Sequence, residues 1–384
     1  MSPATTTITS IPFNRCLPVG REREYVAEAL ESGILAGDGR FTRACHNWLR
    51  RHLGVHGALL TTSGTHALEM TALLLNLEPG DEVIVPSFTF VSSINAYVLC
   101  GAKPVFADIR PDTLNLDERR LSSLITPRTK AIVVVHYAGV GCEMDSILSI
   151  ANSAGISVIE DNAHGLFGRY KGKYLGTFGF MAAQSFHETK NIACGEGGAL
   201  LLNDPALVDR AEILREKGTD RSKFFRGQVD KYNWVDLGSS YLPSELNAAF
   251  LLGQFEMRDV IQSQRRNIWE TYYAELAAWA ASNGVRLPFI PDHCEQPYHM
   301  FYLLMPTLER RQAFIAHMKA RGITTPFHYV PLHSSPMGRR LGGRTEDCPV
   351  TERISDQLVR MPLFNTMSGE ELETVIEAVR EFRY

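Results

Sequence analysis

The chain has 384 residues, 45% of them hydrophobic and 21% charged, which suits a protein of two globular domains. Its net charge of −4, without a long run of Lys or Arg, speaks against nucleic acid as the main partner.

The N-terminal stretch "MSPATTTITS" has no basic segment and no apolar core, so we expect no secretion signal. Apolar runs elsewhere are shorter than the roughly 18 residues of a membrane span, which predicts no membrane association. The seven cysteines are scattered and form no CxxC pair. This pattern is typical of reduced thiols in a cytoplasmic protein and disfavours a metal site.

Most of the chain alternates strands with helices. Helical spacing covers residues 21–32 and 43–53, and "ALLTTSGTHALEMTALLLNL" passes from an apolar run through a turn into a helix. Strands are expected in "EVIVPSF", "KPVFADI", "KAIVVVHYAG", "SVIEDNAHG" and "GGALLLND", and helices in "TFVSSINAYVLCG", "MDSILSIANSAG" and "PALVDRAEILREKG". The alternation predicts an α/β fold with a mostly parallel central sheet and helices on both faces.

The pattern changes after about residue 250. The stretch "FLLGQFEMRDVIQSQRRNIWETYYAELAAWAASNG" predicts a long helix, whole or interrupted. A strand-like "MFYLLMP", a helix in "RRQAFIAHMKARG", the segment "TTPFHYVPLH" and two final helices follow. We therefore expect a large α/β domain over residues 1–250 and a smaller C-terminal α+β domain over residues 251–384.

Lys190 stands in "SFHETKNIACGEGG", between a strand-like segment and a glycine-rich turn, a setting that a solvent-facing lysine does not need. Asp161 ends the predicted strand "SVIED", and the carboxyl end of a parallel strand faces the ligand crevice of an open sheet. The turn "SGTHAL" opens a helix whose first N–H groups suit an anion. Structural alternatives are a loop acid for Asp161 and an N-cap for the turn.

Ser185 precedes Lys190, and Phe88 and Phe90 follow a strand in "PSFTF", although a serine can simply end a strand and aromatic residues are usually core. Together these features match the needs of pyridoxal phosphate. This cofactor requires a lysine amine for its aldehyde carbon, an acid for its pyridine nitrogen, an anion site for its phosphate and a flat surface for its ring. The combination favours a nucleophile over a surface lysine at position 190.

The motifs "SGTHAL", "PSFTFVSSINA", "EDNAHG" and "SFHETKN" followed by "GEGG" resemble those of the DegT-type nucleotide-sugar aminotransferases, pyridoxal-phosphate enzymes of fold type I. "GDGRFTR", "HYAGVGCEMD", "LGSSYLPSEL" and "FHYVPLH" resemble most the TDP-4-oxo-6-deoxy-D-glucose 4-aminotransferases that supply TDP-fucosamine. The resemblance implies a homodimer that transfers the amino group of L-glutamate to the 4-keto carbon of a TDP-4-keto-6-deoxyhexose, giving a TDP-4-amino-4,6-dideoxyhexose.

The resemblance also implies residue roles. Lys190 would bond the cofactor, and Asp161 would pair with its ring nitrogen. The other implied contacts are Gly64, Thr65 and Ser185 at the phosphate, Phe90 against the ring and His164 near the phenolic oxygen.

One motif departs from the family pattern. Many members carry "GxNYRMSEL", whose Asn reaches the phosphate of the neighbouring subunit, whereas this chain has "GSSYLPSEL". Ser240 stands in place of that Asn, and whether Ser239 or Ser240 serves the phosphate stays open.

The diphosphate of a sugar nucleotide calls for cations. "DRSKFFRGQVDKY" supplies Arg221, Lys223, Arg226 and Lys231, although such a stretch can equally be a solvated loop. "FHYVPLH" supplies His328, Tyr329 and His333, from a loop that closes over the sugar or from a packed β-hairpin.

Three alternative functions stay open. The same fold can aminate C3 of a sugar or an amino-cyclitol precursor. A dehydratase of the family is disfavoured because those enzymes carry His at the position of Lys190. A non-catalytic regulatory protein is disfavoured by the intact pair of Lys190 and Asp161.

Overall fold

A central sheet forms the frame of the large domain in the computed structural model, which describes residues 10–383. Among these residues the sheet has seven strands, and β9 runs antiparallel to both neighbours while the other neighbouring pairs are parallel. In spatial order the strands are β1 (Gly57–Thr61), β9 (Gly198–Leu202), β8 (Met181–Ser185), β5 (Ser157–Asp161), β4 (Thr129–Val135), β2 (Glu82–Pro86) and β3 (Lys103–Ala107). The predicted mostly parallel sheet is confirmed.

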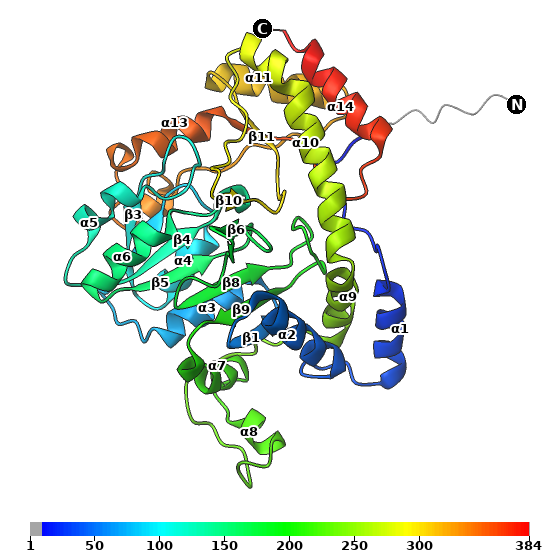
Figure 1. Cartoon of the computed structure of the whole chain (residues 1–384). Coiled ribbons are helices and arrows are strands. Elements are labelled where there is room, and N and C mark those ends of the chain that lie inside the picture. The colour runs from blue at the N-terminus through cyan, green and yellow to red at the C-terminus, as the bar shows by residue number, and fades with distance from the viewer. Residues whose placement is uncertain (1–9, 384) are drawn as a thin grey trace, which may run out of the picture.

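Helices cover both faces of this sheet, because successive side chains of each strand point to opposite sides and nearly all are apolar (Figure 1). One face is packed by α3 (Gly64–Leu74), α4 (Ser92–Leu99) and α7 (Val208–Arg215). The other face is packed by α1 (Glu22–Ser32), α2 (Arg40–Leu53), α9 (Glu245–Glu256), α5 (Leu121–Leu124) and α6 (Met144–Ala154).

The smaller α+β domain has its own apolar core, in which a short antiparallel pair of strands packs between helices. Its elements are α10 (Arg258–Ser282), β11 (Tyr302–Leu304), α11 (Leu308–Ala320), α13 (Pro349–Gln357), β12 (Leu358–Arg360) and α14 (Gly369–Glu381). Short connecting elements are β6 (Arg169–Tyr170), β7 (Lys173–Tyr174), α8 (Arg221–Phe225), β10 (Cys294–Glu295) and α12 (Pro336–Arg340).

The chain passes from the core of the large domain to that of the small domain after residue 250, later than the predicted boundary. The long helix is interrupted at Met257, and Ile261 at the start of α10 still packs in the core of the large domain. Ile268, two turns further on, belongs to the core of the small domain. Ile11 also packs there and pairs with Ile323, so the N-terminal segment joins the C-terminal domain. The apolar spacing of a helix predicts that it is buried on one side, but it does not show which of the two domain cores that side packs against, so the boundary was predicted too early.

The stretch "FHYVPLH" at 327–333, predicted as a closing loop or a hairpin, lies in a loop over residues 324–333. The isolated β-bridge of this loop among the described residues joins Phe327 to Val359. Between α7 and α9 the chain forms an extension, with α8 in it, that projects from the body of the molecule (Figure 1).

The described residues exclude part of the N-terminal stretch discussed above. Residues 1–9, on which the expectation of no secretion signal largely rests, lie outside the described range, as does residue 384. Within residues 10–383, no helix is long and apolar enough to cross a membrane.

Candidate active site

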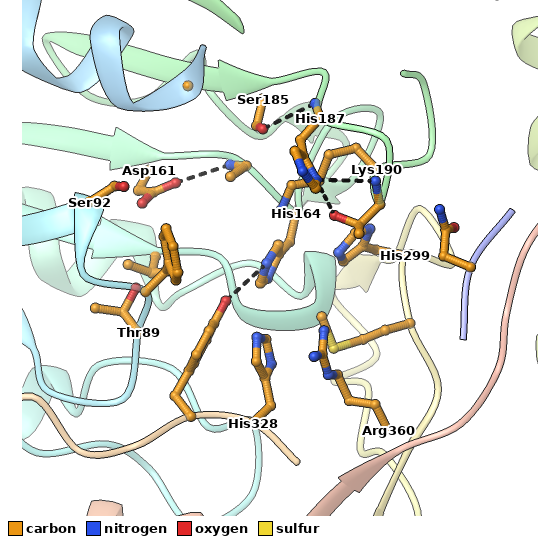
Figure 2. Close-up of a pocket in the computed structure, with 18 of the residues that line it drawn as sticks. Thr89, Ser92, Asp161, His164, Ser185, His187, Lys190, His299, His328 and Arg360 are labelled. Atoms are coloured by element: carbon orange, nitrogen blue, oxygen red, sulfur yellow. Dashed lines mark hydrogen bonds between the residues drawn. The ribbon is translucent and has the colours of Figure 1, made fainter. Parts of the chain in front are cut away.

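A cavity of about 710 Å³ opens where the two domains meet. Its floor comes from the carboxyl ends of β4, β5 and β8 and from the start of α3, and its other wall comes from the loop after Thr325 and the end of β12 (Figure 2). This is the position at which open α/β sheets bind ligands. The volume is suited to a small molecule with a cofactor.

Lys190 lies in the turn after β8 and points into this cavity (Figure 2). Loss of hydration lowers the pKa of Lys190 to about 8, with a further lowering by the charge of Arg360 and an opposing effect of the Asp161 carboxylate. An amine with this pKa is partly neutral near pH 7 and can act as a nucleophile.

The glycine run after Lys190 has a packing reason. Gly198 begins β9, and a Cβ at this position would lie 2.4 Å from the carbonyl carbon of Ser63 and 2.5 Å from the main-chain nitrogen of Gly64. A side chain would therefore push β9 away from the turn that opens α3. Glycine lets the lysine segment and this turn line one cavity.

Asp161 is buried at the end of β5, and its carboxylate faces the cavity. The Ser93 hydroxyl donates to Oδ2 at 2.6 Å, and the main-chain N–H of Ala163 donates to Oδ1 at 3.1 Å. Within the described part of the chain, Asp161 forms no ion pair with a basic side chain. Its charge is therefore available to a cation in the cavity, such as a protonated ring nitrogen.

The start of α3 has main-chain N–H groups that suit an anion. Ser63 caps the helix by accepting from the N–H of His66, and the first N–H groups of a helix have no partner within it. The Thr65 hydroxyl lies 2.7 Å from that of Ser92. A Cβ at Gly64 would lie 3.0 Å from Cβ of Ser185, so strand β8 closes the other side of the site.

The two aromatic residues of "PSFTF" lie in different environments. Phe88 is buried and packs against Tyr137, with ring centroids 5.2 Å apart, and is a core residue. Phe90 lines the cavity and is 57% exposed, so its ring face is open to a planar ligand.

His164 lines the cavity beside the small-domain loop. Its Nε2 lies 3.4 Å from the hydroxyl of Tyr329, and its ring stacks on His299 with centroids 4.5 Å apart. Burial, followed by the charges of Lys190 and Arg360, holds the pKa of His164 well below its usual range, so the ring is neutral. Its Nδ1 is buried without a hydrogen-bond partner among the described residues and can serve a polar ligand atom.

Two of the three residues predicted from "FHYVPLH" line the cavity, namely His328 and Tyr329. His333 does not, which corrects the expectation of a substrate contact. Its ring is fully buried, with Nδ1 2.6 Å from the Ser87 hydroxyl and Nε2 3.2 Å from the Glu352 carboxylate. His333 anchors the end of the loop to the large domain.

The basic segment and Ser240 do not lie at the cavity of their own chain. Arg221, Lys223 and Arg226 pair with acids of α7 and its end, at N–O distances of 3.3, 3.0 and 2.7 Å, and Lys231 is exposed. Ser240 lines a second cavity, of about 860 Å³, together with Arg221 and Arg226. The folded chain thus separates these predicted residues from Lys190.

Sequence reasoning missed His299 and Arg360, which line the first cavity, and Ser93, which donates to Asp161. Ser93 belonged to a predicted helix, and its contact with Asp161 depends on how α4 packs. His299 follows a short loop that carries no motif. Arg360 had a usable signal, because it is a charged residue between a strand-like "LV" and the apolar "MPLF".

The residues present fit pyridoxal phosphate. One cavity combines an enclosed amine at Lys190, a carboxylate at Asp161, a helix start at Gly64, an open ring face at Phe90 and an unpartnered imidazole nitrogen at His164. These are the groups needed for the aldehyde carbon, the ring nitrogen, the phosphate, the ring and its hydroxyl.

Comparison with known proteins agrees with this chemistry. The model of the DegT/DnrJ/EryC1/StrS aminotransferase family matches residues 19–380. The chain is 33% identical over 379 residues to the spore coat polysaccharide biosynthesis protein SpsC of Bacillus subtilis (strain 168), covering 97% of this chain and 96% of that protein. It is 32% identical over 373 residues to GDP-perosamine synthase of Escherichia coli O157:H7, covering 97% and 98%.

Among solved structures, the fold is similar to that of the aminotransferase TlmJ from Streptoalloteichus hindustanus. The TM-score is 0.87 at 29% sequence identity, with 97% of each chain covered. The expected type I fold is confirmed. The chain belongs to the DegT/DnrJ/EryC1/StrS aminotransferase family and is a pyridoxal-phosphate-dependent sugar aminotransferase.

Proposed function

We propose that this enzyme transfers the amino group of L-glutamate to the 4-keto carbon of a TDP-4-keto-6-deoxyhexose and releases a TDP-4-amino-4,6-dideoxyhexose. The observation that carries the proposal is the enclosed Lys190 amine, with a pKa of about 8, in one cavity with Asp161 and the loop that bears His328 and Tyr329. The choice of the sugar follows the motifs that this chain shares with the 4-aminotransferases.

Each residue then has a role. The cofactor, when bound, supplies a ring that accepts electrons from the carbon that loses a proton. Lys190 would hold the cofactor through its Nζ, and the same amine, once released, would take the proton from the donor α-carbon. Asp161 would hold a proton at the ring nitrogen. Gly64, Thr65 and Ser185 would bind the phosphate, Phe90 would pack on the ring, and His164 would orient the ring hydroxyl.

The loop bearing His328 and Tyr329, which line the cavity, would hold the sugar. Burial, with the charges of Arg360, His164 and Lys190, keeps the pKa of His328 well below its usual range, so the imidazole is neutral. Tyr137 holds this ring through a 3.0 Å contact between its hydroxyl and Nδ1. A neutral imidazole and a phenol recognise sugar hydroxyl and keto oxygens without attracting the phosphates.

We further propose a homodimer with shared active sites. Ser240 and the basic residues Arg221, Lys223, Arg226 and Lys231 would serve the cofactor phosphate and the nucleotide of the neighbouring subunit. Large exposed apolar side chains of the extension support this, since Phe225 is 70% and Trp234 79% exposed in the single chain. A surface of this kind is suited to a second copy.

The test supplies the two substrates separately. L-Glutamate should convert the bound cofactor to its amine form, and TDP-4-keto-6-deoxyglucose should convert it back. NMR of the product would establish the aminated carbon and its configuration. The same assay with a GDP-linked 4-keto sugar checks the nucleotide, because one relative is a GDP-perosamine synthase.

Two outcomes would contradict the proposal. Turnover of a 3-keto sugar or a keto-cyclitol in place of the 4-keto sugar would move the reaction to another carbon or substrate. A cofactor that never responds to L-glutamate would remove the proposed donor.

A further inference from the structure

Arg360 ends strand β12, and its guanidinium reaches the active-site cavity from the small domain (Figure 2). Its Cζ lies 4.5 Å from the centroid of the Phe13 ring, and Nη2 donates to the carbonyl of Phe327 at 3.4 Å. Its Nε is buried and has no hydrogen-bond partner among the described residues. The side chain is therefore held in place with donors unused.

No acid of the described residues forms an ion pair with Arg360. Of the two carboxylates that line the cavity, Asp161 is engaged by Ser93 and Ala163, and Glu196 lies 3.7 Å from His187. Removing a guanidinium partly from water costs free energy, and an anion bound to it offsets this cost. The cavity thus holds an unmatched positive charge on its small-domain wall.

The neighbouring imidazoles do not share this role. His164, His299 and His328 are buried, and burial together with nearby positive charges holds the pKa of each well below its usual range. All three rings are therefore neutral near pH 7. Lys190 and Arg360 are the lysine and arginine among the described residues that line the cavity, and the guanidinium of Arg360 keeps its charge at neutral pH.

We infer that Arg360 binds the α-carboxylate of the amino donor. This inference rests on the proposed function and adds a donor site to it. A guanidinium suits a carboxylate because two of its N–H groups can donate in parallel to the two oxygens. The donor class is then a 2-amino acid, with L-glutamate as the proposed member.

Position separates this anion from the diphosphate of the sugar nucleotide. Arg360 and Lys190 line the same cavity, and the charge of Arg360 lowers the pKa of the Lys190 amine. The donor presents its α-carbon to that amine, and the α-carboxylate is one bond away from this carbon. In the sugar nucleotide the diphosphate is attached at C1, across the pyranose ring from the keto carbon at C4. A cation beside the reacting carbon therefore matches the carboxylate.

The half-reactions of the holoenzyme test this inference. In Arg360→Gln, the L-glutamate concentration at half-maximal rate should rise about 10- to 100-fold, the loss expected for hydrogen bonds to a charged group. The reaction of the amine-loaded enzyme with TDP-4-keto-6-deoxyglucose should change less than about threefold, because this substrate lacks the carboxylate. Arg360→Lys should lie between wild type and Arg360→Gln.

A binding measurement supports the kinetics. Calorimetry of 2-oxoglutarate, which carries the α-carboxylate but no amine, with the pyridoxal form should show the same loss in Arg360→Gln. Arg266→Gln is the matched control, since this arginine pairs with Glu270 at 2.8 Å on the exposed side of α10. Cofactor absorbance and thermal unfolding check that each variant is folded. If Arg360→Gln does not fold, the same measurements are made on Arg360→Lys.

Two results would overturn the inference. Equal losses in both half-reactions would give Arg360 no preference for the donor, and a selective loss with the sugar would make it a nucleotide contact. The proposed function can fail independently of this inference. Wild-type enzyme that reacts with L-glutamate but with no 4-keto sugar would contradict the proposed function and would not contradict the donor site at Arg360.

Discussion

Ser93 donates a hydrogen bond of 2.6 Å to Oδ2 of Asp161 and so ties helix α4 to the end of strand β5. The hydroxyl of Thr89 lies 2.7 Å from that of Ser93 and donates to it, because the Ser93 proton is directed to the carboxylate. Neutral hydroxyls and a main-chain N–H thus orient the acid. No basic side chain in the described part of the chain forms an ion pair with Asp161, so its charge can serve a protonated ring nitrogen.

Replacing Ser93 by Ala should slow the half-reaction with L-glutamate roughly tenfold or more, because the acid loses a donor that fixes its direction. Cofactor content, followed by absorbance, should stay near that of wild type. Ser92→Ala is the contrast, since Ser92 contacts Thr65 at the anion site and should weaken cofactor binding instead. Identical effects of the two changes would contradict this division of roles.

Lys190→Ala should lose the covalent link to the cofactor. Borohydride reduction of wild type should fix the cofactor to one peptide, and mass spectrometry should place it on Lys190. Lys171→Ala is a suitable control, because this exposed lysine pairs with Asp145 at 2.6 Å outside the cavity. A label on any other lysine would disprove the assignment.

Capture of pyridoxal phosphate by the apoenzyme should depend on pH through Lys190. Only the neutral amine attacks the aldehyde, and the pKa of Lys190 is lowered to about 8. The capture rate should therefore rise about tenfold per pH unit below pH 7 and level off above about pH 9. Stopped-flow absorbance measures this rate. A midpoint near that of an ordinary lysine would contradict the lowered pKa.

Asp161→Asn should retain bound cofactor but lose roughly two to three orders of magnitude in rate, because a neutral amide does not hold the ring nitrogen protonated. The measurement is single-turnover reaction with L-glutamate at saturating cofactor. Activity within threefold of wild type would exclude Asp161 from the mechanism.

The shared active site is tested by mixing two inactive variants. Lys190→Ala keeps an intact extension, and Ser239→Ala/Ser240→Ala/Arg226→Ala keeps the nucleophile. If the extension acts on the neighbouring subunit, random mixing should restore up to about a quarter of wild-type activity, since half of the dimers are mixed and each holds one complete site. No recovery, after subunit exchange is verified by mass spectrometry, would refute the shared site.

Local pattern was enough to predict the layered fold and to single out Lys190 and Asp161, which line one cavity. Alternating apolar runs and helical stripes depend on a few neighbouring residues, and each strand of the sheet falls in or beside an apolar run of the sequence. Lys190 and Asp161 stand in settings that packing alone does not require. The direction of β9 was beyond this reasoning, because "GALLL" is equally apolar read either way and its direction depends on the connection that carries Lys190.

The sequence by itself thus determined the layered fold and singled out Lys190, Asp161 and the turn that opens α3 as site candidates, since each is carried by a short local motif. Only the tertiary structure decided that Ser93 orients Asp161, that Arg360 reaches the cavity and that His333 and Ser240 do not. These contacts join segments far apart in the chain. Side-chain reach is a few ångströms, so the packing of α4, β12 and the loop at 324–333 determines which polar groups meet.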